Sequence, residues 1–418
     1  MKEHNWFRLD NAAKVYPVIQ TDQWTPMFRL VAVMDEDVCP ELLQKALDSL
    51  TDRFPSFFVC MRTGFFWYYL EKLKKTIKVE EDVINPTGPV MRGEPLLRIR
   101  YYRNRIAFEI HHVVTDGNGG LVFFKTLLAQ YLRLLGHDIP FEKGILNPKD
   151  APDPGELDDA FLRFSRMKVL PTRMEERAYR IRGTKLPASY MRVTTGTMSA
   201  KQVYDVAKSY NATITEFLAA VLLQSVYRIQ LADGKPQRPV KVSVPVNLRQ
   251  FYPTNTLRNF SQYLNPGVDP QYGEFSFEEI LSSVHHYMRL MCNEKNLNAR
   301  MSKNVADEIN PVLRVVPLFL KNVAIFAEWS RIGEKLFSIT LSNLGKVDMP
   351  EEMSKHVERL DFVLHTSRIN ACECSVSTLG DKLSLSVASA IAERYVERLV
   401  FTSLVKHSIH VLIESNEL

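Results

Sequence analysis

A histidine pair followed by an aspartate and glycines is the stretch of this sequence best suited to chemistry. Residues 108–120 read FEIHHVVTDGNGG, so His111 and His112 are adjacent and Asp116 lies four residues beyond the second histidine. Histidine is the natural general base near neutral pH, and a nearby aspartate can either orient it or hold the loop in shape. Glycine permits left-handed backbone conformations and close approach of a ligand. The glycines of this stretch are Gly117, Gly119 and Gly120.

Other chemistries for the same residues have less support. A metal site would use His112 and Asp116, but no third histidine, cysteine or carboxylate lies at a matching spacing, so no metal is expected. A nucleophile would need a GxSxG elbow or a cysteine near a credible base, and neither occurs. A second pair, His285 and His286 in SSVHHYMRLM, has no aspartate or glycine after it, and we assign it no role.

Local patterns place the histidine pair at the end of a strand. Apolar residues alternate over 97–101 and again over 106–110, which predicts two strands joined by a short turn. Helical spacing follows over 121–135 and ends at Gly136, a plausible C-cap. Because ligands commonly meet α/β sheets where strands end, the predicted strand–loop–helix unit suits a reacting group.

The rest of the chain mixes predicted helices and strands without a repeat. Residues 40–55 have amphipathic helical spacing, and Thr213 with Glu216 forms a capping-box pattern before an apolar helix. Cys372 and Cys374 alternate with Val376 along a predicted strand, so we interpret them as small core residues. The five cysteines show no CxxC spacing and indicate neither zinc nor a disulfide framework. The pattern predicts a mixed α/β fold.

The length predicts two lobes. At 418 residues and 48.1 kDa the chain can form two cores, and its composition changes to proline and acid at Asn147–Asp159. We therefore expect an N-terminal lobe over 1–148, a linker over 149–189 and a C-terminal lobe over 190–418. The basic segment 163–185 within this linker could hold phosphates or could be a solvated linker face.

Charge and hydropathy bear on partners and location. A net charge of +5 with interspersed acids favours an anionic ligand weakly and argues against a nucleic-acid partner. The start, MKEHNWFRLD, shows no basic region followed by an apolar run, so we expect a cytoplasmic protein. The most apolar window, Val312–Trp329, contains Arg314, Pro317, Lys321 and Glu328, which predicts a buried or interfacial helix rather than a membrane span.

The histidine stretch resembles a known signature. HHVVTDG, from His111 to Gly117, is similar to the HHxxxDG motif of the acyl-CoA-dependent acyltransferase superfamily. That superfamily includes chloramphenicol acetyltransferase, plant HxxxD acyltransferases, nonribosomal-peptide condensation domains and mycobacterial polyketide-associated acyltransferases. RLDNAAKVYP (8–17) followed by FRL resembles the start of bacterial alcohol-acetyltransferase-like members. VPVNLRQFYP (244–253) resembles the segment with the family's structural arginine, and LSNLGKV (341–347) resembles its SNxG strand end.

The resemblance implies a fold and a set of roles. It implies two pseudo-symmetric chloramphenicol-acetyltransferase-like lobes with a tunnel between them and the catalytic histidine at its middle. His112 would act as general base through Nε2, and Asp116 would pair with Arg249 as a brace between the lobes. The remaining implied site residues are His111 and Gly117, which would shape the loop, and Asn343 or Ser342, which would stabilise the oxyanion.

The implied activity is transfer of an acyl group from acyl-CoA to a hydroxyl acceptor. Acyl-CoA would be a co-substrate, with no permanently bound cofactor, and the acceptor would be a small alcohol or amine. The absence of a DFGWG motif disfavours the plant subgroup, and we expect no adjacent carrier-protein domain, which disfavours a peptide-synthetase module. The alternatives are a condensation-type amide or ester synthase that uses a carrier-protein-bound donor, and a non-catalytic relative. An acyl carrier protein and a peripheral membrane contact stay open as partners.

Overall fold

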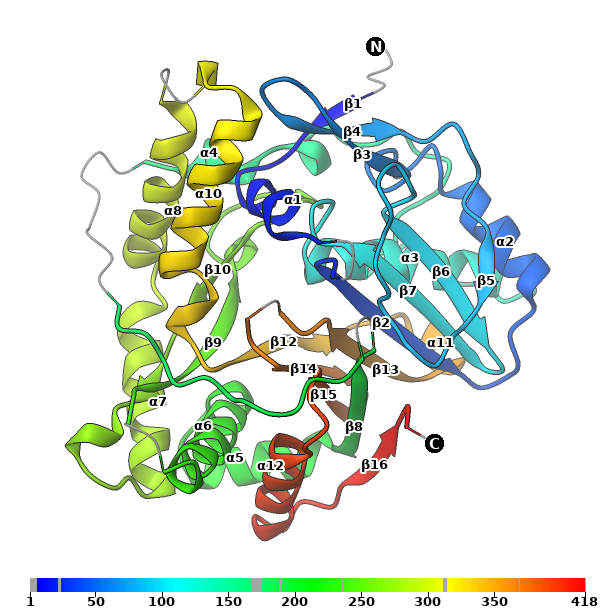
Figure 1. Cartoon of the computed structure of the whole chain (residues 1–418). Coiled ribbons are helices and arrows are strands. Elements are labelled where there is room, and N and C mark those ends of the chain that lie inside the picture. Colours follow the sequence, from blue (N-terminus) through cyan, green and yellow to red (C-terminus); the bar gives the residue numbers. More distant parts are fainter. Residues whose placement is uncertain are drawn as a thin grey trace.

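Two large β-sheets organise the part of the chain that the structure describes (Figure 1). The computed structural model describes residues 6–21, 24–166, 175–187, 190–234, 237–310, 314–367 and 369–417. The first sheet has the strand order β13-β2-β7-β6-β5. Its strands are β2 (Met27–Met34), β5 (Val79–Glu81), β6 (Leu97–Tyr102), β7 (Arg105–His111) and β13 (Val357–Leu364). The two strands predicted around residues 97–110 are confirmed as β6 and β7.

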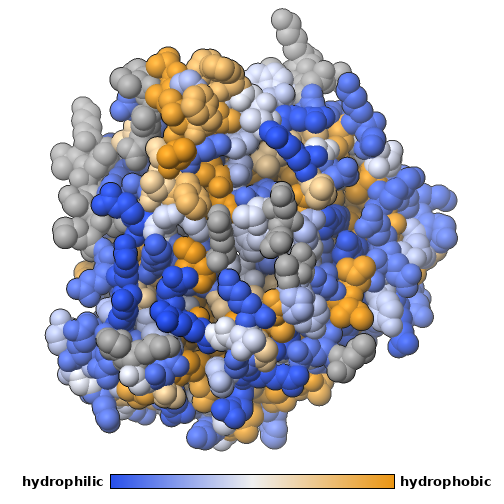
Figure 2. All heavy atoms as spheres, viewed as in Figure 1, coloured by the Kyte–Doolittle hydropathy of each residue, from blue (hydrophilic) through white to orange (hydrophobic). Residues whose placement is uncertain are grey.

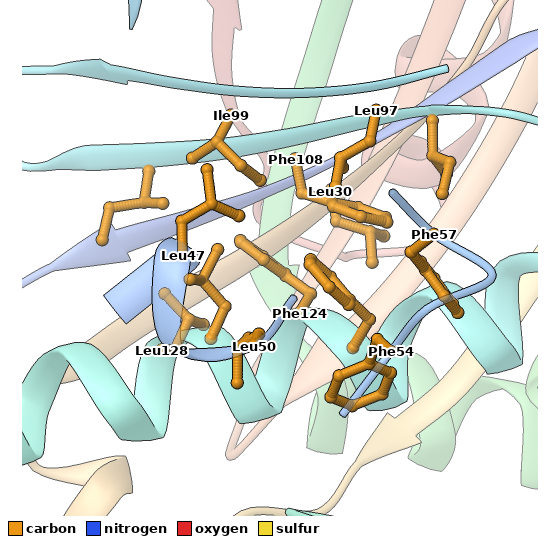
Figure 3. Packing of buried hydrophobic residues seen from close by; sticks show 14 of the residues in the cluster. Leu30, Leu47, Leu50, Phe54, Phe57, Leu97, Ile99, Phe108, Phe124 and Leu128 are labelled. Carbon is orange, nitrogen blue, oxygen red and sulfur yellow. The ribbon is translucent and has the colours of Figure 1, made fainter. Parts of the chain in front are cut away.

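Helices α2 (Pro40–Ser49) and α3 (Gly117–Leu134) pack on the first sheet around an aromatic core (Figure 3). The amphipathic helix predicted over 40–55 is confirmed in part: α2 begins at Pro40 and buries Leu43 and Leu47, but it ends at Ser49. On α3, the Phe123 ring stacks on Phe57 with centroids 4.8 Å apart. This packing fixes the axis of α3 and so the position of its N-terminus, which directly follows the histidine pair.

The second sheet has the order β10-β9-β12-β14-β15-β8-β16, with β11 paired to β9. Its strands are β8 (Arg192–Ser199), β9 (Val240–Asn247), β10 (Ser261–Leu264), β11 (Gly267–Val268), β12 (Ile339–Val347), β14 (Cys372–Leu379), β15 (Lys382–Ser389) and β16 (Leu412–Ser415). The helices packed against it are α5 (Ala200–Ser209), α6 (Ile214–Ala232), α7 (Phe277–Met291) and α12 (Tyr395–Lys406). The predicted capping box starts α6, and Cys372 and Cys374 are buried in this core, as expected.

Strand β13 joins the two lobes. It follows β12 and α11 in the chain, yet it pairs with β2 in the first sheet and buries Leu360 and Phe362 in the first core. The hydroxyl groups of Ser375 and Ser377 on β14 donate to the carbonyls of Phe362 and Leu360. The expected C-terminal lobe over 190–418 therefore does not include β13, because the apolar face of this strand matches the first core.

The segment expected to link the lobes is partly structured. It contains η2 (Pro154–Leu157) and α4 (Ala160–Phe164), and Glu156 pairs with Arg53 of the first lobe at 2.6 Å. Much of the basic stretch 163–185 lies outside the described residues, so its two interpretations stay open. The short elements elsewhere in the described ranges are η1 (Ala12–Val15), α1 (Tyr16–Ile19), η3 (Leu248–Gln250), η4 (Pro270–Tyr272), η5 (Glu334–Leu336) and α11 (Glu351–Ser354), and a longer helix, α8, spans Glu294–Ile309.

A small sheet and a long helix lie beside the first lobe. The small sheet has the order β1-β4-β3, with β1 (Trp6–Arg8), β3 (Val59–Thr63) and β4 (Tyr68–Lys72). Helix α10 (Leu318–Ile332) covers most of the apolar window noted in the sequence; Val312 lies outside the described residues. The expectation of a buried helix is wrong, because Phe319 and Val323 are 66% and 68% exposed. The alternative, an interfacial helix, stays a prediction.

No single helix in the described ranges is long and apolar enough to cross a bilayer. The pair α5 and α6 meets the length and composition together, but the two helices are bent by 80° relative to each other.

Candidate active site

His112 lies in the turn between β7 and α3. Its backbone N–H donates to the carbonyl of Pro26 at 2.8 Å, and β7 pairs with β2 up to the Met27–His111 register. Four residues later Asp116 caps α3, because its Oδ1 accepts the N–H of Gly119 at 3.0 Å. The predicted placement of the pair at a strand end is confirmed, and the cap gives the short loop a defined exit into the helix.

The His112 imidazole is held between two aromatic rings. It stacks on Tyr16 with centroids 5.1 Å apart and an interplanar angle of 20°, and it lies 5.0 Å from the Phe28 ring. The residue is half-buried. Burial lowers the pKa of His112, although hydrogen bonding to Asn259 and the charge of Asp116 oppose this shift. The imidazole is therefore neutral near neutral pH, which is the form that a general base needs.

Asn259 sets the orientation of this ring. Its Oδ1 lies 3.4 Å from His112 Nδ1, and its Nδ2 donates both to the His112 carbonyl at 2.9 Å and to Asp10 Oδ2 at 3.0 Å. Because both of these partners are acceptors, the atom that faces them is the amide nitrogen, and the atom that faces His112 Nδ1 is the amide oxygen. Since an amide oxygen only accepts, Nδ1 carries the hydrogen and Nε2 has the free lone pair. The arrangement selects the tautomer in which Nε2 can accept a proton.

Asn259 is in turn held by a buried carboxyl group, whose pKa is raised by burial. Asp10 is fully buried; its Oδ1 accepts the Ala13 N–H at 2.8 Å and its Oδ2 lies 3.5 Å from Arg258 Nε. Sequence reasoning missed Asn259 as a site residue and gave no individual role to Asp10 or Tyr16. The last two lie in the segment RLDNAAKVYP, whose resemblance was the available signal, whereas no motif marks Asn259.

His111 points into the protein interior. It is fully buried; its Nδ1 accepts the N–H of Val113 at 2.9 Å, and its Nε2 lies 3.1 Å from Gln20 Oε1. Burial lowers the pKa of His111 to about 3. The hydrogen bond from the Val113 backbone to His111 suits the expected part of this residue in shaping the loop, which stays a prediction.

Asp116 and Arg249 meet across the lobes. Arg249, on η3 at the end of β9, places Nη1 2.8 Å from Asp116 Oδ2, which also accepts the Phe260 N–H at 2.8 Å. The guanidinium further donates to the carbonyls of Thr256 and Arg258. Burial by itself raises the pKa of Asp116. The Arg249 charge and the hydrogen bonds that Asp116 accepts from Arg249, Gly119 and Phe260 outweigh burial and lower this pKa overall. Asp116 is therefore an ionised carboxylate with both oxygens engaged away from the imidazole.

The loop glycines are needed for close packing. None of the three has a positive φ, so the left-handed conformations that glycine permits are not used here. A Cβ on Gly117 would lie 2.8 Å from Leu344 Cδ2, and one on Gly120 would lie 2.8 Å from the Phe28 ring. A Cβ on Gly119 would overlap the carbonyl of Leu257. Chain segments from both lobes therefore press on the first turn of α3, and only glycine leaves room for them.

The SNLG segment on β12 reaches the same helix turn. Leu344 contacts Gly117, but the Asn343 side chain donates to Thr215 Oγ1 at 2.9 Å and accepts the Gly345 N–H at 2.7 Å. Gly345 has a φ of +74°, so the strand bends there. One N–H of the Asn343 amide is engaged by Thr215, which leaves one for another acceptor. The assignment of Asn343, with neighbouring Ser342, as oxyanion donor stays a prediction.

The second histidine pair lies apart on α7, where His285 Nδ1 is 3.4 Å from Glu216 Oε2 and His286 bonds to Ser282. Within the ranges that the structure describes, no cluster of three or more histidine, cysteine or carboxylate side chains could hold a metal ion.

Comparisons with known proteins show the fold. No family model matches the chain, and no curated protein matches its sequence. A solved structure of TRI101 from F. sporotrichioides, in complex with coenzyme A and T-2, matches with a TM-score of 0.67 and 12% identity over 99% of this chain and all of that one. Polyketide synthase associated protein 5 from Mycobacterium tuberculosis matches with a TM-score of 0.59 and 15% identity over 95% and 96%. The starter condensation domain of rhizomide synthetase, with C8-CoA and Leu-SNAC, matches with a TM-score of 0.59 and 12% identity over 97% and 95%. The chain therefore has the two-lobed α/β fold of chloramphenicol acetyltransferase and condensation domains.

Proposed function

We propose that this protein is an acyltransferase that moves an acyl group from acyl-CoA to a hydroxyl acceptor, with His112 as general base. One observation carries the proposal: His112 Nδ1 lies 3.4 Å from the Asn259 amide oxygen, which makes Nε2 the nitrogen that can accept a proton. Burial also lowers the pKa of this imidazole, which favours the neutral form. The fold supports it, since two of the similar structures hold coenzyme A or an acyl-CoA.

Acyl transfer from a thioester needs little more than this base. His112 Nε2 takes the proton of the acceptor hydroxyl as its oxygen attacks the thioester carbonyl. The C–S bond then breaks, and the proton passes from Nε2 to the departing coenzyme A thiolate. Proton transfer by a placed base is worth ~10²–10⁴ in rate. An oriented donor such as the Asn343 or Ser342 side chain would add a few kcal/mol by stabilising the oxyanion.

The other site residues act by positioning in this proposal. The Asp116–Arg249 pair ties the histidine loop to the second lobe, and His111 and Gly117 hold the loop's shape. No step requires a permanently bound cofactor. An amine acceptor would use the same base, because it too must lose a proton during attack.

Thiol release from acyl-CoA tests the proposal directly. The purified chain, mixed with donors from acetyl- to palmitoyl-CoA and with pooled alcohols or amines, should release free thiol only when an acceptor is present. The same donors loaded on an acyl carrier protein provide the comparison. Release from the loaded carrier alone would identify a condensation-type synthase, and release from neither donor would identify a non-catalytic relative.

Asn259→Ala should lower kcat/KM by about tenfold to a hundredfold, because the imidazole loses the acceptor that orients it and misplaced groups react slowly. The variant also leaves Asp10 and the His112 carbonyl short of a donor, so its melting temperature should fall. Turnover with a saturating acyl-CoA, measured beside thermal melts, provides the two readings.

Asn298→Ala is the matched control. Asn298 is also a buried amide, but it donates to the Phe164 carbonyl and the Tyr252 hydroxyl, away from the histidine. This variant should melt earlier with near-normal turnover. If both variants lose turnover only in proportion to their stability, the orienting role of Asn259 is wrong.

A further inference from the structure

Helix α10 and the tip of the β3–β4 hairpin form one exposed apolar surface. Figure 2 shows hydrophobic side chains gathered over α10. We call this the α10 surface; its members are Phe65, Phe66 and Trp67 of the hairpin and Val315, Phe319, Leu320 and Val323 in and before the helix. Phe65 is 71% exposed and Val315 is 70% exposed. Monomeric proteins rarely leave so many large apolar side chains together in water.

Hydrogen bonds hold the two parts of this surface together. The Leu318 N–H donates to the Phe65 carbonyl at 2.9 Å, and Lys321 Nζ donates to the Phe66 and Arg314 carbonyls at 3.2 Å. The same ammonium lies 3.4 Å from the centre of the Trp67 ring. Because Lys321 is buried and turned inward, its charge is satisfied inside and the apolar side chains are left outside. The surface is therefore an ordered feature of the fold.

Cationic side chains surround the α10 surface. Arg314 and Arg331 are exposed at the two ends of the helical segment, and Arg92 is exposed beside β3, where it bonds to Thr63. None of these three arginines forms an ion pair with a residue in the described ranges; the exposed acids near them in the sequence are Glu328 on α10 and Glu94, two residues after Arg92. A mostly positive rim around aromatic and aliphatic residues matches the headgroups and acyl region of an anionic bilayer.

The α10 surface lies next to the candidate active site. Helix α10 packs on η1 and α1, and α1 begins at Tyr16, whose ring stacks on His112. A lipid surface bound on the exposed face of α10 would therefore be separated from the segment that supports the base by this one helix.

We propose that the α10 surface docks this protein on anionic lipid bilayers. A second copy of the chain is the competing occupant. In a symmetric dimer the same surface patches face each other, so the arginines around this patch would approach like charges, which opposes association. A bilayer with anionic headgroups instead offers opposite charge to the arginines and an apolar region to the aromatic hairpin tip.

Vesicle co-sedimentation of the full chain tests the proposal. We expect binding to vesicles made of equal parts phosphatidylcholine and phosphatidylglycerol, and much weaker binding to phosphatidylcholine alone. The double substitution Phe319→Asp and Val323→Asp should lower the partition coefficient at least about tenfold, because it places charges on the inserted face. Val405→Asp is the matched control, since Val405 is 58% exposed on α12, outside the α10 surface, and it should bind like the unchanged protein.

The possible outcomes distinguish a bilayer from a second copy of the chain as the occupant, and they distinguish the docking proposal from the acyltransferase proposal. Absence of vesicle binding overturns the docking proposal, and so does an equal loss of binding in Val405→Asp. If the protein does not bind vesicles but forms a dimer that the double substitution dissociates, the α10 surface belongs to a contact with a second copy. That result would also overturn the docking proposal. Because sedimentation needs no turnover, His112→Ala should bind vesicles normally, so failure of docking and failure of the acyltransferase proposal are distinguishable.

Discussion

Replacing His112 by alanine should lower kcat/KM by about 10²–10⁴-fold, the usual contribution of a general base. The expected loss follows from the free Nε2 lone pair, which no other side chain of the loop can supply. Stability should change little, because the ring is half-buried and its contacts with Tyr16 and Phe28 are the main ones lost. Thiol-release kinetics and thermal melts of the purified variant measure the two effects.

His111→Ala is the internal control for this prediction. It should keep more turnover but lose more stability, about 1–3 kcal/mol, because the buried Val113 N–H and the Gln20 side chain lose their partner. His112→Ala should therefore lose more turnover, whereas His111→Ala should lose more stability. Equal, small losses of turnover in both variants would end the assignment of His112 as base.

The pH profile of the unchanged protein provides a second reading of the same base. Only the neutral imidazole accepts a proton, and burial lowers the pKa of His112 below its ordinary value near 6.5. Activity should accordingly be complete at neutral pH and should fall as the pH drops through the lowered pKa, on the acid side of 6.5. The residual activity of His112→Ala should lack this acid limb.

Breaking the Asp116–Arg249 pair should destabilise the fold by about 3–5 kcal/mol for either single alanine substitution, because the remaining charge is left buried and unpaired. The side chains are only 5% and 15% exposed. Removing Asp116 also removes the cap of α3, which is worth about 1 kcal/mol by itself. The double variant should cost clearly less than the sum of the singles, and a double-mutant cycle from thermal melts measures the coupling.

Asp158 and Arg163 offer a matched pair of the same residue types. They lie 3.4 Å apart but are 41% and 54% exposed, so their alanine variants should cost no more than about 1 kcal/mol. Since the pKa of Asp116 is lowered, the stability from its pair is present at neutral pH and is lost in acid as the pH falls through the lowered value. If Asp116→Asn abolished turnover without a melting shift, and if the melting shifts of Asp116→Ala and Arg249→Ala were additive, Asp116 would be a proton relay instead of a brace.

Local sequence determined the unit that carries the histidine. Alternation over 106–110, the histidine pair, Asp116 and the following helical spacing are all short-range patterns, and the structure shows them as β7, a turn, a capped N-terminus and α3. Such patterns can be interpreted from sequence because a strand or helix period depends on residues only a few positions apart. The resemblance of short segments also predicted Arg249 as the partner of Asp116, and Arg249 Nη1 lies 2.8 Å from Asp116 Oδ2.

The tertiary structure decided what surrounds that unit. Asn259, 147 residues from His112, orients the ring, and no local pattern marks it because its role arises from packing between the lobes. The placement of β13 beside β2 and the contacts that require Gly119 to be glycine likewise depend on chain segments distant in sequence. The sequence did not determine whether the apolar residues of α10 are buried or exposed. An apolar helix has the same sequence pattern whether a protein core or a lipid surface covers it. Periodicity determined the elements, whereas the burial and the partner of each side chain were decided when the two lobes packed together.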